Sequence, residues 1–533
     1  MGGGTIERSL RSLPPVYGCL FLLIIASIAG RIVHPPPVAD PPCRSIADNP
    51  VVRSFAQAIG VIQKQYSKPP EWEALTGVAI TRMLHSLDPH SSFYDRSHFT
   101  EMLNEQDSRY YGIGAIINQR RQGVYVLGVI PGTPAERAGM RYGDKIVAID
   151  GTLTDMWSQN KVLANVRGAA GTEVQITVER VGLPRRQTYT IERDEVPYPS
   201  VLNHFMIRPG MGYVDLTGGF SQQTTNELSA AINELKSQGM DRLLIDLRQN
   251  PGGLLKQAIQ ASELFLPTGS VIVSVVGREG RTVRRSYVSE NQAPETLPLA
   301  LLIDEGTASA AEILAGALQD NGRACLVGEE SFGKGLVQTI FRLRDGTGLS
   351  LTTARYLTPS GRSIHRSMAV GGLYDYGRSR KLKGPFPDHP SEAGVGGINP
   401  DLPDRPGKTD VSEDERLRLR DASFEFVRLA SAGLIPGLED WRVRRTEAVQ
   451  RSRRTEYAVN PLVRRLFLDF VRRHPEWLIS EPLSESARHY VDRRIRAEMI
   501  SAAYGPESAD QYLLDEDPQV LRALDWLKRR PLP

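Results

Sequence analysis

The stretch Leu299-Ala-Leu-Leu-Ile303-Asp-Glu-Gly-Thr-Ala-Ser309-Ala-Ala-Glu312 joins an apolar strand pattern to the start of a helix through a tight turn. The five apolar residues up to Ile303 are typical of a buried strand, and the small residues around Ser309 predict a helix opening. In layered α/β folds, ligands bind at the carboxyl ends of the strands, which is where this turn falls. The stretch therefore predicts an α/β core with Ser309 at its functional edge.

Strand and helix patterns alternate on the N-terminal side of this turn, which indicates an α/β layer structure. The loop Asn250-Pro-Gly-Gly253 follows one of the strands, so we expect it at the same sheet edge as Ser309. In chain order, the predicted segments are the strand 213–216, the helix 224–238, the strand 242–247, the helix 254–264 and the strand 271–276.

A second stretch, Glu330-Ser-Phe-Gly-Lys334-Gly-Leu-Val-Gln338, sets one lysine between two glycines. A serine hydroxyl is a poor nucleophile until a base removes its proton, and a neutral lysine can be that base. Each segment alone has an ordinary interpretation: Ser309 as a helix N-cap, and Lys334 as a solvated loop residue. Together they predict a Ser/Lys peptidase site. Lowering a lysine pKa from about 10.4 to near 7 requires roughly 4–5 kcal/mol, which burial can supply.

Composition gives the size and excludes some functions. A chain of 533 residues is too long for one core and suggests three or four domains. A formal net charge of +3 over this length gives no electrostatic reason to expect nucleic-acid binding.

The cysteines and histidines do not predict a metal or disulfide scaffold. Cys19, Cys43 and Cys325 lie far apart, which leaves at most one bridge, Cys43 to Cys325, and we expect Cys325 in a core. His85, His90 and His98 are the nearest approach to a histidine cluster, and we interpret them as structural or surface residues. We expect no metal and no cofactor.

The N-terminus has the pattern of a targeting element. Arg8 and Arg11 precede an apolar run from Val16 to Gly30, which suits either a cleaved signal peptide or an uncleaved signal anchor. A proline-rich spacer follows. We therefore expect the rest of the chain to be exported, to the periplasm or the extracytoplasmic face of the membrane.

From about residue 110 the apolar period changes to two, which predicts strands near 124–129, 145–149 and 173–179, with a helix at 156–166. The motifs Tyr111-Gly-Ile-Gly114 and Gly143-Asp-Lys-Ile-Val-Ala-Ile-Asp-Gly151 make this region resemble a PDZ domain. Backbone N–H groups of Gly112, Ile113, Gly114 and Ala115 would bind a terminal carboxylate, and the next strand would accept the peptide as an added strand.

Five motifs in one order resemble the carboxyl-terminal processing peptidases, or tail-specific proteases, from about residue 45 to residue 405. They are the PDZ module, Asp246-Leu-Arg-Gln-Asn-Pro-Gly-Gly253, Gly306-Thr-Ala-Ser-Ala-Ala-Glu312, Gly333-Lys-Gly-Leu-Val-Gln338 and Tyr356-Leu-Thr-Pro-Ser-Gly-Arg-Ser363.

This resemblance implies a role for each matching residue. Ser309 would be the nucleophile, Lys334 its general base, and Gln338 the residue that holds the lysine amine. The oxyanion hole would be formed by backbone N–H groups at Gly252 or Gly253 and at Ala310. Arg167 lies where the family can couple the PDZ domain to the protease, although alone it would be a surface arginine. Arg248 is open between a structural ion-pair partner and an organiser of the oxyanion site.

The chain departs from the family pattern in two places. An insertion spans about 368–394, and a helical tail extends from about residue 410 to the end. In this tail, Val463, Phe467, Phe470 and Val471 define one apolar face and Val491, Ile495 and Met499 another, which we interpret as packing faces.

These observations predict a multidomain α/β + β protein, with a PDZ domain ahead of an α/β layered protease core and helical regions at both ends. The expected divisions are 1–44 signal and linker, 45–105 N-terminal helices, 106–194 PDZ domain, 195–408 Ser/Lys protease core and 409–533 helical extension.

The predicted function is an exported serine endopeptidase that cuts proteins near their C-termini. Its expected partners are substrates with apolar C-terminal tails, with an activating adaptor and homo-oligomerisation left open, and membrane association through the N-terminal segment. The alternatives are a catalytically silent PDZ-containing scaffold and a hydrolase of non-peptide esters or amides.

Overall fold

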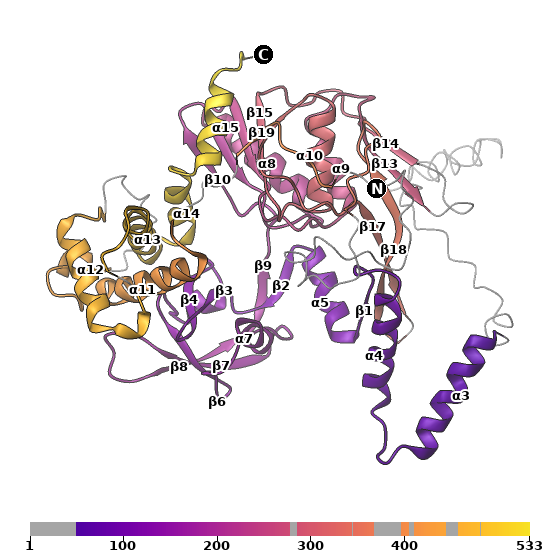
Figure 1. The fold of residues 1–533 in the computed structure, drawn as a ribbon, viewed down its shortest axis with the longest axis horizontal. Helices are drawn as coiled ribbons and strands as arrows, with labels where there is room; N and C mark the ends of the chain where they lie inside the picture. Colours follow the sequence, from indigo (N-terminus) through magenta and orange to yellow (C-terminus); the bar gives the residue numbers. More distant parts are fainter. Residues whose placement is uncertain are drawn as a thin grey trace, which may run out of the picture. The chain divides into compact units, whose positions relative to one another are not determined.

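A computed structural model describes residues 49–277, 285–343, 345–366, 396–404, 410–443, 457–479 and 481–532 (Figure 1). The predicted signal segment and the insertion at 368–394 lie outside these residues. The chain divides into two compact units, Met1–Ala79 and Ile80–Pro533. Within the described ranges, no helix combines the length and the apolar character that crossing a membrane requires.

The predicted N-terminal helices begin in the first unit. Helix α3 spans Pro50–Gln65; Asn49 caps it by accepting a hydrogen bond from the Val51 N–H at 2.9 Å, and proline occupies its first turn. None of its residues is buried, and Phe55 is among its exposed apolar side chains. Helix α4, Trp72–His85, begins in this unit and ends in the next.

The second unit is built on a six-stranded sheet in the order β10-β11-β12-β15-β16-β19, in which all neighbours except β10 and β11 run parallel. Alternate residues of each strand face opposite sides. In β15, Leu299, Leu301 and Ile303 pack on one side, while Ala300 and Leu302 pack on the other. The strands are β10 (Asn203–Arg208), β11 (Met211–Asp215), β12 (Arg242–Asp246), β15 (Leu299–Ile303), β16 (Cys325–Gly328) and β19 (Leu402–Pro403).

Helices cover both faces of this sheet (Figure 1). Helices α8 (Thr224–Ser237), α9 (Leu255–Glu263) and α10 (Ala310–Asp320) pack on one face, and α15 (Pro518–Lys528) packs on the other. The predicted α/β layered core is confirmed, and Cys325 is a buried free thiol within it.

A second, antiparallel sheet adjoins this core, in the order β1-β18-β13-β14 with β17 paired to β18. The segment 271–276 is a strand, as predicted, and it belongs to this sheet. An apolar run identifies a strand without identifying its neighbour, so its sheet could not be read from the pattern. The strands are β1 (Ser92–Tyr94), β13 (Val271–Gly277), β14 (Arg285–Val288), β17 (Leu336–Arg342) and β18 (Gly348–Leu357).

The predicted PDZ region forms its own sheet, in the order β3-β4-β5-β7-β8 with β6 paired to β5. Strand β3 is an edge strand with helix α7 beside it. Helix α7 begins at Gln159, later than predicted, because Ser158 caps it by accepting from the Lys161 N–H at 3.3 Å. The elements are β3 (Ala115–Arg120), β4 (Gly123–Val129), α6 (Pro134–Arg137), β5 (Lys145–Ile149), β6 (Thr152–Leu153), α7 (Gln159–Val166), β7 (Glu173–Glu179) and β8 (Gln187–Glu192).

Two connecting elements join this domain to the core. Strands β2 (Arg109–Gly112) and β9 (Asp194–Pro197) pair with each other where the chain enters and leaves the domain. Helix α5 (Arg96–Gln106) precedes β2, and its Phe99 is buried. A Cβ at Gly348 of β18 would lie 2.1 Å from the Phe99 ring, so α5 packs closely on the second sheet.

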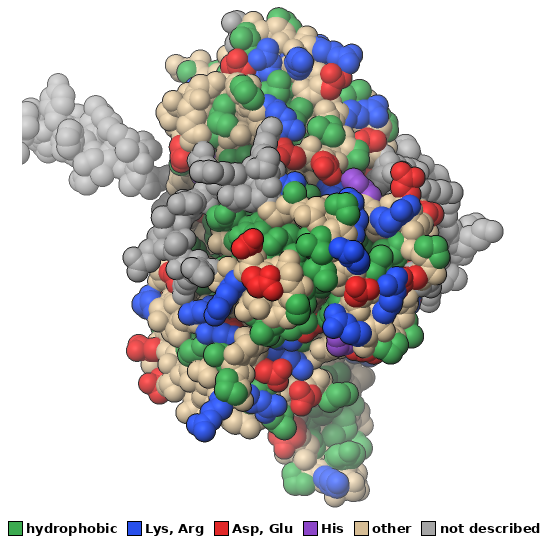
Figure 2. Space-filling model, turned by 90° about the vertical axis from the view of Figure 1, so that its left-hand side faces the viewer, with side chains coloured by type: hydrophobic (Ala, Val, Ile, Leu, Met, Phe, Trp, Pro, Cys, Tyr) green, Lys and Arg blue, Asp and Glu red, His purple; other side chains and the backbone are tan. Residues whose placement is uncertain are grey.

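The C-terminal extension is helical, as predicted, and contains α11 (Glu413–Ser431), α12 (Pro461–Arg473), α13 (Glu485–Tyr504), α14 (Pro506–Leu514) and α15. Both predicted apolar faces lie in one core cluster, which confirms their packing role. On the face shown in Figure 2, basic and acidic side chains are interspersed with apolar ones.

Candidate active site

Ser309 lies at the turn from β15 into α10, in a strained backbone conformation. Its φ of 53° and ψ of −114° are rare for a residue with a side chain. Its N–H donates to Glu312 Oε2 at 2.8 Å, and its carbonyl accepts from the Tyr356 hydroxyl at 2.9 Å. These two contacts therefore hold the backbone of Ser309 in place.

The loop Asn250-Pro-Gly-Gly253 lies against this serine, as predicted from the sheet edge. A Cβ built on Gly252 would lie 2.7 Å from Ser309 Cβ and 2.8 Å from the Ala310 nitrogen. Gly252 also has a φ of 93°. Only glycine permits both this conformation and this approach.

The backbone donors of the loop are not equivalent. The Gly252 N–H donates to Asn250 Oδ1 at 2.9 Å, so it is engaged within the turn. Among the described residues, the N–H groups of Gly253 and Ala310 have no acceptor. Of the three predicted oxyanion-hole residues, Gly253 and Ala310 therefore offer donors in this state, while Gly252 shapes the turn.

Lys334 and Gln338 are in contact, as predicted: Lys334 Nζ donates to Gln338 Oε1 at 3.0 Å. The Gln338 amide nitrogen donates in turn to the carbonyl of His90. Burial lowers the pKa of Lys334, and the carboxylates of Asp88 and Glu312 oppose this shift. Within the described chain, no hydrogen bond joins Lys334 Nζ to Ser309 Oγ.

Glu312 joins the two segments that carry the serine and the lysine. One carboxylate oxygen accepts from the N–H groups of Ser309 and Lys334, both at 2.8 Å. The other accepts from the Ser331 hydroxyl at 2.5 Å and the Gly333 N–H at 2.7 Å. Burial raises the pKa of Glu312, and these four donors oppose that rise. This buried carboxylate therefore sets the position of the Lys334 loop relative to Ser309.

We expect Glu312→Gln to destabilise the protein by about 2–4 kcal/mol and to reduce kcat about 100-fold, because the new amide nitrogen would face donors. Chemical denaturation and steady-state cleavage would measure both effects. The matched control is Glu305→Gln, which changes an exposed carboxylate in the same turn and should shift stability by less than about 0.5 kcal/mol. Equal behaviour of the two variants would contradict the positioning role.

Two of these contacts were missed by sequence reasoning. Glu312 stood in the quoted motif three residues after Ser309, the spacing of a capping box, but its contacts to the lysine loop had no local signal. His90 was interpreted as structural or surface. It is half-buried, and its carbonyl orients Gln338. His85 is exposed, and so is His98.

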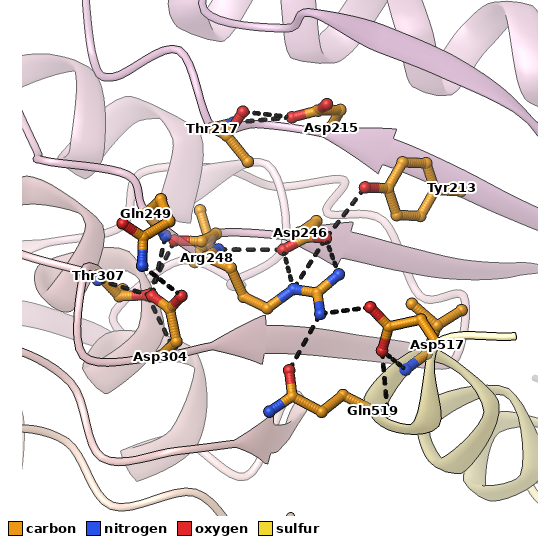
Figure 3. Close-up of polar contacts among 12 residues, drawn as sticks. Tyr213, Asp215, Thr217, Asp246, Arg248, Gln249, Asp304, Thr307, Asp517 and Gln519 are labelled. Carbon is orange, nitrogen blue, oxygen red and sulfur yellow. Dashed lines mark hydrogen bonds and ion pairs between the residues drawn. The ribbon is translucent and has the colours of Figure 1, made fainter. Parts of the chain in front are cut away.

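Arg248, two residues before the loop, lies in a network of charges (Figure 3). Its guanidinium donates to Asp246 through Nε and Nη2, and through Nη1 to Asp517 at 2.8 Å and Gln519 at 3.0 Å. Asp246 is almost fully buried and also accepts from the Tyr213 hydroxyl. Arg248 therefore forms ion pairs with Asp246 and Asp517.

The predicted carboxylate-binding residues Gly112, Ile113, Gly114 and Ala115 form the link between β2 and the edge strand β3. Gly114 has a φ of 78°, and its carbonyl accepts from the Ile130 N–H. The loop thus leads directly into the strand edge that a peptide would extend.

Arg167 follows helix α7 and reaches out of the PDZ region to α5. Its guanidinium pairs with Glu101 and, at 3.2 Å, with Glu105, and it lies 4.8 Å from the centre of the Tyr110 ring. Because α5 packs on the second sheet of the core, this contact joins the two domains.

In the part of the chain that the structure describes, no three histidine, cysteine, aspartate or glutamate side chains gather in a group that could hold a metal ion.

The sequence matches the family model for peptidase family S41 over residues 210–372 and the PDZ domain model over residues 125–180. A carboxy-terminal-processing protease of Bartonella bacilliformis is 39% identical over 314 residues, covering 58% of this chain and 71% of that protein. A carboxyl-terminal-processing protease of Synechocystis is 37% identical over 310 residues, covering 57% of this chain and 72% of that protein. The solved photosystem II D1 C-terminal processing protease has 28% identity and a TM-score of 0.37, covering 70% of this chain and 92% of that chain.

Proposed function

The chain belongs to the carboxyl-terminal processing proteases of peptidase family S41, and we propose that it cuts proteins near their C-termini with Ser309 as nucleophile and Lys334 as general base. Membership of this family makes it a serine-type peptidase with a PDZ domain. The observation that best supports the assignment of residues is the double contact of Glu312, which holds the backbones of Ser309 and Lys334 on one carboxylate oxygen.

In this proposal, neutral Lys334 removes the proton of the Ser309 hydroxyl as its oxygen attacks the scissile carbonyl carbon. The oxyanion that forms accepts hydrogen bonds from the Gly253 and Ala310 N–H groups, each contributing about 3–4 kcal/mol when well aimed. Protonated Lys334 then gives its proton to the leaving amine, and the carbon–nitrogen bond breaks. Water attacks the resulting ester and neutral Lys334 accepts a proton from it. Protonated Lys334 then gives this proton to the Ser309 oxygen as the ester bond breaks and the product acid leaves.

Tail capture is the second element of the proposal. An apolar substrate tail would add to the edge of β3 beside α7, with its carboxylate at the loop 112–115. The contact of Arg167 with Glu101 and Glu105 supports a coupling of this event to the core.

The test is to compare unstructured substrates that differ only at the C-terminus. We expect a free apolar tail to be cut with kcat/KM at least about 10-fold above the same polypeptide with an amidated C-terminus, because the amide removes the charge that the loop would bind. An acidic tail serves as the second comparison. Equal cutting of all three would contradict tail capture and would leave the peptidase assignment untouched.

We also propose that residues 1–44 export the chain, because Arg8 and Arg11 precede an apolar run as in a signal segment. Fusing this segment to a reporter that is active only outside the cytoplasm tests the proposal, and an inactive reporter would contradict it.

A further inference from the structure

The C-terminal helix α15 lies on the face of the catalytic sheet opposite to α10. Val520, Ala523 and Leu527 are fully buried there, against a cluster that includes Leu244 and Leu302 of the central strands. A helix that packs on a sheet through several fully buried side chains moves little relative to that sheet. Its first residues therefore hold a fixed position relative to the carboxyl ends of β12 and β15.

Asp517 and Gln519 open this helix and face Arg248 (Figure 3). Asp517 uses its two oxygens for separate purposes: Oδ1 caps the helix by accepting from the Gln519 and Val520 N–H groups, and Oδ2 accepts from Arg248 Nη1. Gln519 is almost fully buried and donates its amide to the carbonyl of Asp404. Both acceptors are thus held in place by contacts of their own.

Arg248, Gln249 and Asn250 lead into Pro251 and the glycines, and each is fixed by a different segment. Gln249, with a φ of 59°, donates through its N–H and its amide to Asp304, which follows β15. Asn250 donates to the carbonyl of Leu216 beyond β11. Arg248 is held by Asp246 of β12 and by α15.

Of these contacts, only those of α15 come from outside the residues that resemble the protease family. The Arg248 side chain is 18% exposed and Asp517 is 23% exposed, so their ion pair is shielded from water more than a surface pair. Charge-assisted hydrogen bonds of this kind are among the stronger contacts that hold a loop.

We propose that Asp517 and Gln519 are positioning residues of the active site, which hold the oxyanion loop through Arg248. The inference rests on the proposed function, since it assigns them an effect on the Gly253 donor. In this proposal, helix α15 of the C-terminal extension helps to hold the active-site loop in place. Without the contacts from α15, Arg248 keeps, among its described contacts, only its bonds to Asp246, and we expect the loop to be held less firmly.

The test compares Asp517→Asn with wild type. Asparagine is as good an N-cap as aspartate, so the helix start is retained. Because the side-chain oxygen of the new asparagine must still cap the helix, its amide nitrogen faces Arg248 Nη1. Both groups are hydrogen-bond donors, so the contact with Arg248 is lost. We expect kcat to fall about 10- to 50-fold with KM changed by less than about 3-fold, and the reaction of Ser309 with an active-site phosphonate to slow in proportion.

The matched control is Asp525→Asn, which removes the same charge from the same helix at an exposed pair with Arg529 and should leave kcat unchanged. Gln519→Met removes the second acceptor without altering the cap and should lower kcat about 5-fold. If Asp517→Asn fails to fold, Gln519→Met alone tests the positioning role.

Two failures are distinguishable. Wild-type kcat in both Asp517→Asn and Gln519→Met, with Ser309→Ala inactive, would overturn the positioning role alone. Cleavage by Ser309→Ala at the wild-type rate would overturn the proposed function itself. A melting temperature of Asp517→Asn near that of wild type, together with the expected loss of kcat, would establish positioning over a general loss of stability.

Discussion

Ser309→Ala is expected to abolish peptide cleavage, lowering kcat at least about 10⁴-fold. Alanine lacks the oxygen that would form the ester with the substrate, and nothing else in the site replaces it. The fold should be retained, because the strained backbone at this position is held by Glu312 and Tyr356. The measurement is cleavage of an unstructured protein, with fragments mapped by mass spectrometry.

The matched control is Ser237→Ala, at the exposed end of α8, which should cut at the wild-type rate. A thermal melt should show the two variants folded alike. Residual cutting by Ser309→Ala at more than about 1% of the wild-type rate would argue that another group is the nucleophile.

Lys334→Met and Lys334→Arg are both expected to lower kcat about 10³-fold or more. Methionine keeps the apolar stem and removes the base. Arginine keeps the positive charge but does not lose its proton in proteins, so it separates a general base from an electrostatic role. If Lys334→Arg retained most of the activity, the charge and not the proton acceptor would be what the site requires.

The pH profile of wild type tests the same assignment. Burial lowers the pKa of Lys334, and below that pKa the amine is protonated and cannot accept the serine proton. Activity should therefore rise as pH rises from about 6 to about 9 and level off above the lysine pKa. Burial also lowers the pKa of His90 to about 4, so this neighbour stays neutral throughout the window. A flat profile, in a protein whose circular dichroism is constant over the range, would count against Lys334.

Much of this arrangement was readable from local patterns. The strand 299–303 was predicted with its observed bounds, and its turn into α10 placed Ser309 at the sheet edge. The strand and the helix start were predictable because each is specified within a few positions of sequence. The contact of Lys334 with Gln338 was implied by the resemblance to the family and not by the local pattern, and the structure contains it.

Contacts between distant segments could not be predicted from the sequence. The resemblance left open whether Gly252 or Gly253 supplies an oxyanion donor. In the structure the Gly252 N–H donates to the Asn250 side chain, and no motif specifies the orientation of that side chain. The carbonyl of His90 reaches Gln338 across 248 positions, and Arg248 reaches Asp517 across 269. A single sequence carries no signal for such pairs, because each partner lies on a separate element whose packing decides whether they meet.

The most direct test of the central claim is to treat the wild-type protein with an active-site-directed phosphonate and locate the adduct by peptide mapping. We predict one adduct, on Ser309, formed rapidly in wild type and at least about 100-fold more slowly in Lys334→Met, because the lysine is needed to deprotonate the attacking oxygen. An adduct on any other residue, or equal rates in the two proteins, would contradict a Ser309/Lys334 peptidase.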